Sequence, residues 1–95
     1  MKAKEKKNII LRLLSERTYG LGEDYAVSVQ HIDFHYMGLN IDSYRLSFFP
    51  NRGNRFMDSS VLTIISTVQV FKCWSTIKVK HGAPVVYVVV EDDRA

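Results

Sequence analysis

The stretch that decides the fold is residues 85–90, VVYVVV, near the carboxyl end of the chain. Branched and aromatic side chains favour β-strands, and apolar residues at every position are typical of a strand covered on both faces. Residues 85–90 therefore predict a central strand. Before it, Ile77 and Val79 predict a partner strand and residues 81–84 the turn between the two, while residues 91–94 end the strand in water.

Residues 24–36 predict another strand, because they are rich in aromatic and β-branched side chains. From residue 31 onward the even positions are apolar and the odd positions polar, whereas residues 25, 27 and 29 are apolar at odd positions. This change of phase requires a bulge near Gln30 or a late start of the strand. A helix is the alternative, because apolar residues at 21, 25, 29, 32 and 36 also fit a period of 3.6.

Residues 38–43 are typical of a turn, and residues 44–48 then alternate between apolar and polar side chains. Pro50 and Gly53 end this second strand, because proline lacks the amide proton for a ladder bond and glycine favours turns. The two strands are predicted to form an antiparallel hairpin.

Two segments predict helices. Residues 3–17 group the apolar positions 9, 10, 13 and 14 on one face and leave Lys6, Lys7 and Arg12 on the rest, with glycines at 20 and 22 ending the helix. Residues 58–74 begin with capping side chains and carry apolar residues at helical spacing up to about Trp74. A strand is the alternative for residues 58–74, because threonine and valine are poor helix formers.

The order α-β-β-α-β-β predicts an α+β fold: a two-layer sandwich of a mostly antiparallel sheet of about four strands, with two helices on one face. Ninety-five residues suffice for one domain, so residues 1–95 are expected to form a single unit. The composition, 46% hydrophobic and 24% charged, is that of a folded soluble protein. No apolar run is long enough to cross a membrane, so no membrane partner is expected.

The single cysteine, Cys73, cannot form an internal disulfide, and this indicates a reducing compartment, with the cytoplasm as the expected location. Its place beside Trp74 in a predicted buried helix is typical of a small apolar residue rather than a nucleophile. The chain lacks the glycine-rich loops that bind phosphates or dinucleotides and lacks a nucleophile elbow. We therefore expect no catalytic residue, no cofactor and no enzymatic activity.

A metal site is one hypothesis, since His31, Asp33 and His35 fall on one side of the predicted strand. Two imidazoles and a carboxylate form a known donor set for zinc or non-haem iron. The simpler interpretation, which we favour, is that these are the solvent-facing positions of an amphipathic strand.

Nucleic-acid binding is a second hypothesis. Residues 44–56 interleave four aromatic side chains with three arginines, a combination that can stack bases and neutralise phosphates. Tyr44 and Phe48 are needed for the core, which leaves the loop around residues 50–56. The candidate residues are Phe49, Arg52, Arg55 and Phe56 in or beside this loop and Lys4, Lys6 and Lys7 in the first helix.

Protein binding is the lead hypothesis. Eleven aromatic residues exceed what a small one-sided sheet buries easily, so some of them are expected to face a protein partner or a second copy of the chain. The candidates for this exposed surface are Tyr19, Phe49, Phe56 and Tyr87. The sequence thus predicts a small, non-enzymatic module that binds another macromolecule.

Overall fold

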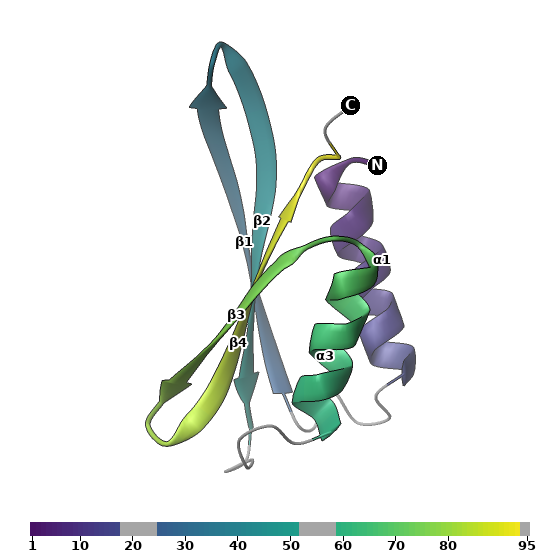
Figure 1. Cartoon of the computed structure of the whole chain (residues 1–95), viewed down its shortest axis with the longest axis vertical. Helices are drawn as coiled ribbons and strands as arrows, with labels where there is room; N and C mark the ends of the chain where they lie inside the picture. Colours follow the sequence, from purple (N-terminus) through teal and green to yellow (C-terminus); the bar gives the residue numbers. More distant parts are fainter. Residues whose placement is uncertain (18–24, 52–58, 94–95) are drawn as a thin grey trace.

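The computed structural model describes residues 1–17, 25–51 and 59–93 and confirms the predicted α+β fold (Figure 1). The elements follow the expected order, and their bounds are α1 (Ala3–Arg17), β1 (Tyr25–Tyr36), β2 (Leu39–Pro50), α3 (Ser59–Val70), β3 (Trp74–Lys80) and β4 (Ala83–Glu91). Residues 18–24, 52–58 and 94–95 lie outside the described residues, and with them several positions used above, among them Tyr19, Gly20, Gly22, Arg52, Gly53, Arg55 and Phe56.

The four strands form one antiparallel sheet in the order β1-β2-β4-β3. As residues 85–90 predicted, β4 is a central strand, paired with β2 on one side and β3 on the other. Both helices lie on the same face of the sheet (Figure 1). No described helix is long and apolar enough to cross a membrane.

Both hairpins close with turns of two residues. Met37 and Gly38 have φ angles of 51° and 78°, and His81 and Gly82 repeat these values. Positive φ at both central positions is the type I′ geometry, whose twist matches that of the flanking strands. The longer turns expected over residues 38–43 and 81–84 are therefore wrong, and the strands extend to within one residue of each glycine.

Strand β1 is a strand, not a helix, and it contains no bulge. Its register with β2 is unbroken from Tyr25 opposite Pro50 to Tyr36 opposite Leu39. The apolar pattern changes side because only the first part of β1 lies in the body of the molecule, while the tip of the hairpin projects beyond the helices (Figure 1). Where no helix covers the strand, its helix-facing side can carry polar residues such as His31 and Asp33.

Helix α3 ends at Val70, several residues before the predicted end. Lys72 adopts a left-handed φ of 55°, and the Lys72 and Cys73 amides donate to the carbonyls of Gln69 and Val68 at 3.0 and 3.2 Å. These two bonds form a Schellman motif, which closes a helix and usually contains glycine at the left-handed position. Because lysine occupies that position here, the sequence contains no glycine that would mark the end of the helix. Trp74 is the first residue of β3 rather than part of a helix.

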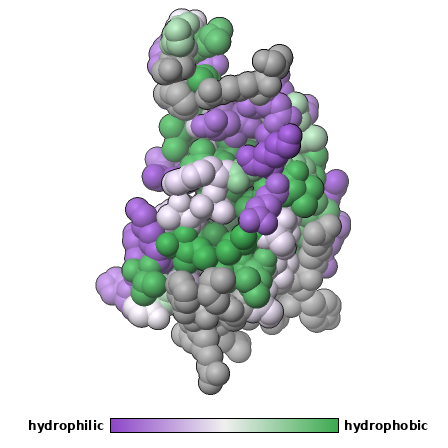
Figure 2. All heavy atoms as spheres, in the orientation of Figure 1, coloured by the Kyte–Doolittle hydropathy of each residue, from purple (hydrophilic) through white to green (hydrophobic). Residues whose placement is uncertain are grey.

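The core lies between the sheet and the two helices. Alternate residues of β4 face the helices, and the buried cluster comprises Ile10, Leu14, Tyr25, Leu46, Phe48, Val61, Ile64, Val68, Val86, Val88 and Val90. Lys6 shares the buried side of α1 and is only 5% exposed, so its predicted place on the outer surface of the helix is wrong. Some large apolar side chains remain exposed, among them Leu62 and Val70 of α3, and Figure 2 shows hydrophobic residues gathered on part of the viewed face.

Candidate functional site

The face of the sheet opposite the helices carries a shallow depression of about 590 Å³. All four strands contribute to it, because the side chains of a strand alternate between the two faces of the sheet. We call this surface the open sheet face and define it by Ser28, Gln30, Arg45, Ser47, Phe49, Trp74, Thr76, Lys78, Lys80, Tyr87 and Val89. It is the candidate functional site.

Three aromatic side chains lie on the open sheet face, one on each of three adjacent strands. Trp74 of β3 is 67% exposed, Phe49 of β2 is 37% exposed and Tyr87 of β4 is half-buried. Large apolar rings are normally withdrawn from water, so an exposed tryptophan beside other rings is typical of a binding surface.

Three cationic side chains surround these rings. The ammonium groups of Lys80 and Lys78 lie 5.5 and 5.8 Å from the centre of the Tyr87 ring, within the range of a cation–π interaction. Arg45 donates a hydrogen bond from Nη2 to Gln30 Oε1 at 2.5 Å, which holds the guanidinium against the sheet. None of the eleven residues that define the open sheet face carries a carboxylate, although Glu91 follows on the same side of β4 and lines a neighbouring depression with Trp74 and Val89. The surface therefore combines positive charge with stacking surface.

The residues that the sequence nominated for nucleic-acid binding lie apart from one another. Phe49 belongs to the open sheet face. Lys6 is buried and ion-paired with Asp93, and the Lys7 ammonium lies 4.6 Å from the centre of the Tyr44 ring, on the helix side of the sheet. Lys4 is exposed on α1. The described structure does not bring these lysines together with Phe49.

Sequence reasoning missed most of the cationic residues of the open sheet face. Trp74, Thr76, Lys78 and Lys80 alternate with half-buried or apolar neighbours and share one side of β3. This two-residue period is present in the sequence, but it was not recognised because Trp74, its first residue, was assigned to the preceding helix. Tyr87, in contrast, was among the aromatic residues expected to be exposed.

The potential metal ligands that lie together are His31, Asp33 and Asp42, whereas the sequence predicted His31, Asp33 and His35. His31 Nε2 lies 3.0 Å from Asp33 Oδ1 and 3.4 Å from Asp42 Oδ1, and the three groups offer donor atoms within 4.8 Å of one another. Among the described residues, His35 is not part of this group. The imidazole of His31 stacks on Tyr44 at 4.7 Å, and all three side chains of the group are exposed.

Asp33 and Asp42 are directly opposite each other across the β1–β2 ladder. A hydrogen bond between their carboxyl groups raises the pKa of Asp33 and lowers the pKa of Asp42. Asp42 therefore loses its proton more readily than Asp33, and both carboxyl groups lie close to the His31 imidazole. The three side chains thus provide partners for one another.

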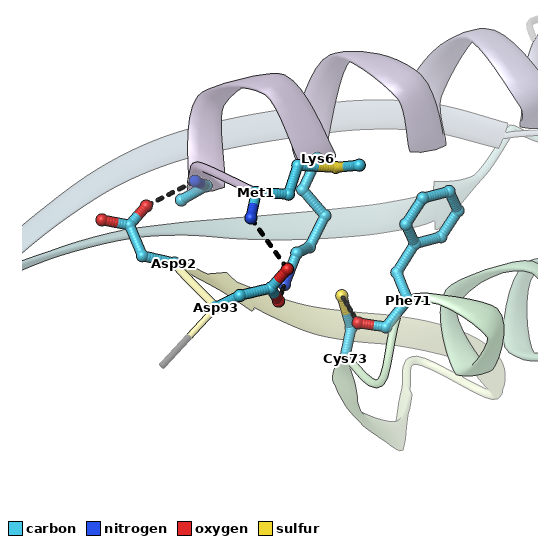
Figure 3. Close-up of polar contacts among 7 residues, drawn as sticks. Met1, Lys6, Phe71, Cys73, Asp92 and Asp93 are labelled. Carbon is cyan, nitrogen blue, oxygen red and sulfur yellow. Dashed lines mark hydrogen bonds and ion pairs between the residues drawn. The ribbon is translucent and has the colours of Figure 1, made fainter. Parts of the chain in front are cut away.

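The acidic residues that follow β4 also bind the start of α1, as Figure 3 shows. The Ala3 amide donates to Asp92 Oδ1, Lys6 pairs with Asp93, and the Met1 ammonium lies 3.0 Å from Asp93 Oδ2. The hydrogen bonds from Lys6 and the Met1 ammonium lower the pKa of Asp93 to about 2. This cluster holds the helix to the sheet.

Cys73 lies beside this cluster, in the connection between α3 and β3 (Figure 3). It is half-buried, and Sγ donates to the Phe71 carbonyl at 3.7 Å. Burial raises the pKa of the Cys73 thiol, so the thiol stays protonated at neutral pH. A protonated thiol is a poor nucleophile.

Comparison with protein-family models, with curated proteins and with solved structures finds no match for this chain.

Proposed function

We propose that the protein binds nucleic acid through the open sheet face. The observation that carries the proposal is the combination of Arg45, Lys78 and Lys80 with exposed rings among the eleven residues that define this surface, none of which is acidic. Such a surface is complementary to a polyanion that also presents flat rings. The proposal keeps the nucleic-acid hypothesis from the sequence but moves it to different residues.

A protein partner, the lead hypothesis from the sequence, fits this surface less well. Lysine is depleted in protein–protein interfaces, whereas aromatic residues and arginine are enriched. Burying Lys78 and Lys80 under a protein would require acidic partners to compensate for the lost hydration. A nucleic acid supplies that compensation through its phosphates at every nucleotide.

In this proposal the cations and the rings have separate roles. The ammonium groups of Lys78 and Lys80 contact phosphates as mobile point charges, and the Arg45 guanidinium presents a planar set of donors to phosphate or base. Phosphate contacts release bound counterions, so affinity decreases as salt increases. With about three phosphate contacts to a single strand, the logarithm of the binding constant falls with a slope of roughly −2 against the logarithm of salt concentration.

The test is the binding of fluorescein-labelled oligonucleotides, single- and double-stranded, measured by anisotropy over a series of salt concentrations. Lys78→Glu and Lys80→Glu should each weaken binding and reduce the salt dependence. Arg12→Glu, on exposed helix surface, makes the same change in charge away from the sheet and should have a much smaller effect. A larger effect of Lys4→Glu than of Lys78→Glu would move the site to α1, and no salt-sensitive binding of any oligonucleotide would refute the proposal.

Protein binding is a distinguishable outcome of the same study. If the open sheet face pairs two copies, sedimentation will show a concentration-dependent oligomer, and oligonucleotides will not compete for the surface. The non-enzymatic character and the cytoplasmic location, inferred from the absent catalytic motifs and the single cysteine, remain parts of this proposal.

A further inference from the structure

We infer that the open sheet face binds a single strand in an extended conformation, with successive bases stacked on Trp74, Tyr87 and Phe49. This inference rests on the proposed function and specifies its substrate. It follows from the positions of the three rings in the strand register.

The rings lie on a diagonal across three strands. Trp74 of β3 is opposite Val89 of β4, and Tyr87 lies two residues before Val89 on the same face. Tyr87 is in turn opposite Ser47 of β2, and Phe49 lies two residues after Ser47. From Trp74 to Tyr87 and from Tyr87 to Phe49, the line of rings therefore passes to the neighbouring strand and shifts by two residues along it. Both shifts run in the same direction along the sheet.

The size of these steps determines the conformation of the ligand. Diagonal neighbours on one face of an antiparallel pair are about 7 to 8 Å apart. Stacked nucleotides within one strand of a duplex rise by only about 3.4 Å. A strand that places one base on each ring must therefore be extended, with its bases separated from one another and each in contact with a side chain.

A duplex cannot stack its bases on the three rings of the open sheet face. Its base faces are covered by neighbouring base pairs, so the rings could contact only its backbone. The major groove, about 12 Å wide, admits a helix or a two-stranded ribbon, but four strands about 4.8 Å apart form a wider layer. The sheet therefore cannot enter the groove, and its rings contribute binding energy only to a single strand.

The cations lie where an extended backbone would pass. Lys78 and Lys80 hold their ammonium groups over Tyr87, the central ring of the diagonal, and Arg45 lies in the same cross-strand row as Val89 and Trp74. When a base stacks on Tyr87, the two ammonium groups move from the ring to the flanking phosphates. Each ammonium group thus exchanges its contact with the Tyr87 ring for a contact with a phosphate.

Trp74 is the only tryptophan in the chain, so intrinsic fluorescence reports on the first ring alone. We would titrate the protein with an oligothymidylate of about 16 nucleotides and with a duplex of the same length. The single strand should quench or shift Trp74 emission and bind roughly tenfold or more tightly than the duplex. The duplex, held by phosphates only, should leave the emission nearly unchanged.

Substitutions separate stacking from charge. Trp74→Leu should weaken binding of the single strand by roughly 5- to 150-fold and leave duplex binding unchanged, whereas Trp74→Phe should restore much of the affinity because it keeps a ring. Tyr87→Leu should act in the same direction. Leu62→Ala removes an exposed apolar side chain from α3 and should not affect binding. Circular dichroism of each variant establishes that it is folded.

The outcomes distinguish this inference from the proposed function. Base stacking would be overturned, and nucleic-acid binding would stand, if the protein bound both oligonucleotides with equal affinity. In that case Trp74→Leu would leave the affinity unchanged and Lys78→Glu would lower it. Absence of binding to either oligonucleotide would overturn both. Loss of affinity on Trp74→Leu that Trp74→Phe fails to restore would also contradict stacking, because a contact specific to the indole, such as a hydrogen bond from its N–H group, would then explain the loss.

Discussion

Lys6, near the start of the first helix, is ion-paired with Asp93, which follows the last strand. The two partners differ in environment: the side chain of Lys6 is 7% exposed, whereas that of Asp93 is 56% exposed. The pair joins α1 to the strand at the centre of the sheet. It also explains how a helix with a lysine on its inner side can pack against an apolar layer, because the aliphatic stem is buried while the ammonium reaches a carboxylate.

This difference predicts an unequal response to substitution. Asp93→Asn leaves a buried ammonium without its anionic partner, and an uncompensated buried charge is strongly unfavourable. Lys6→Met keeps the apolar stem and leaves Asp93 in contact with water and the Met1 ammonium. Asp93→Asn should therefore lower the thermal midpoint more than Lys6→Met does, with Lys4→Met as an exposed control. Equal decreases in the thermal midpoint would show that the unpaired ammonium of Lys6 is not the main source of destabilisation in Asp93→Asn.

The same carboxylate predicts an acid dependence of stability. The pKa of Asp93 is about 2 in the folded chain against an ordinary value of 3.8. Its contribution to stability is therefore complete above about pH 4 and is lost as pH falls through 2, because the unfolded chain binds the proton more readily. The gap in urea midpoint between the native protein and Asp93→Asn should narrow as pH falls from 5 to about 2. A gap that stays constant would contradict the assignment.

Two neighbouring positions of α3 should differ sharply in sensitivity. Ile64 is fully buried in the core, whereas Leu62 is half exposed. Ile64→Ala should cost about 2 to 5 kcal/mol of unfolding free energy through lost burial and the cavity left behind. Leu62→Ala should change it by less than about 0.5 kcal/mol. Denaturant unfolding measures both, and comparable losses would mean that α3 is rotated about its axis relative to the described packing.

Removing a hydroxyl from α3 should stabilise the protein. Thr67 is 1% exposed, and its Oγ1 is buried with no hydrogen-bond partner among the residues that the structure describes. Thr67→Val replaces this hydroxyl with a methyl group and should add about 1 kcal/mol to the unfolding free energy. Thr63→Val is the matched control, because Thr63 Oγ1 donates to the Ser59 carbonyl at 2.8 Å and should gain nothing. A loss of stability in Thr67→Val would indicate a water or side-chain partner for Oγ1.

The β3–β4 turn should be improved by asparagine at its first position. His81 adopts a φ of 51°, a conformation that asparagine tolerates better than most residues. His81→Asn should therefore raise the unfolding free energy by roughly 0.5 to 1 kcal/mol. Gly82→Ala should lower the unfolding free energy, because φ at this position is 78°, which strains a residue with a side chain. A methyl group there would meet no atom of the described residues within 4 Å, so steric clash is not the cause. An opposite sign for either variant would contradict a type I′ turn.

The order of the elements was predictable because each depends on a local pattern. The apolar spacing of residues 3–17 requires a helix, and the valine-rich run before Glu91 requires a central strand, whatever surrounds them. Both hairpin glycines were also visible. The lengths of the turns were not, because Met37 and His81 at positive φ are unusual residues for a type I′ turn.

The candidate site was less predictable. The end of α3 is closed by hydrogen bonds around Lys72 rather than by glycine, so Trp74 was placed in the wrong element and its alternation with the lysines of β3 was overlooked. Lys6 was expected on the outer surface because its charge suggests exposure. Its burial depends on Asp93, which lies 87 residues further along the chain, and a local pattern carries no information about so distant a partner.

The sequence by itself determined the class of fold and the order α-β-β-α-β-β, since helices and strands reflect periodicities within a few residues. Only the tertiary structure decided which face of the sheet the helices leave open and which side chains meet there. Trp74, Tyr87 and Phe49 come from three different strands, and their diagonal is set by the registers of β2, β3 and β4. Register depends on hydrogen bonds between distant segments, and that is why the candidate binding surface emerged only from the folded chain.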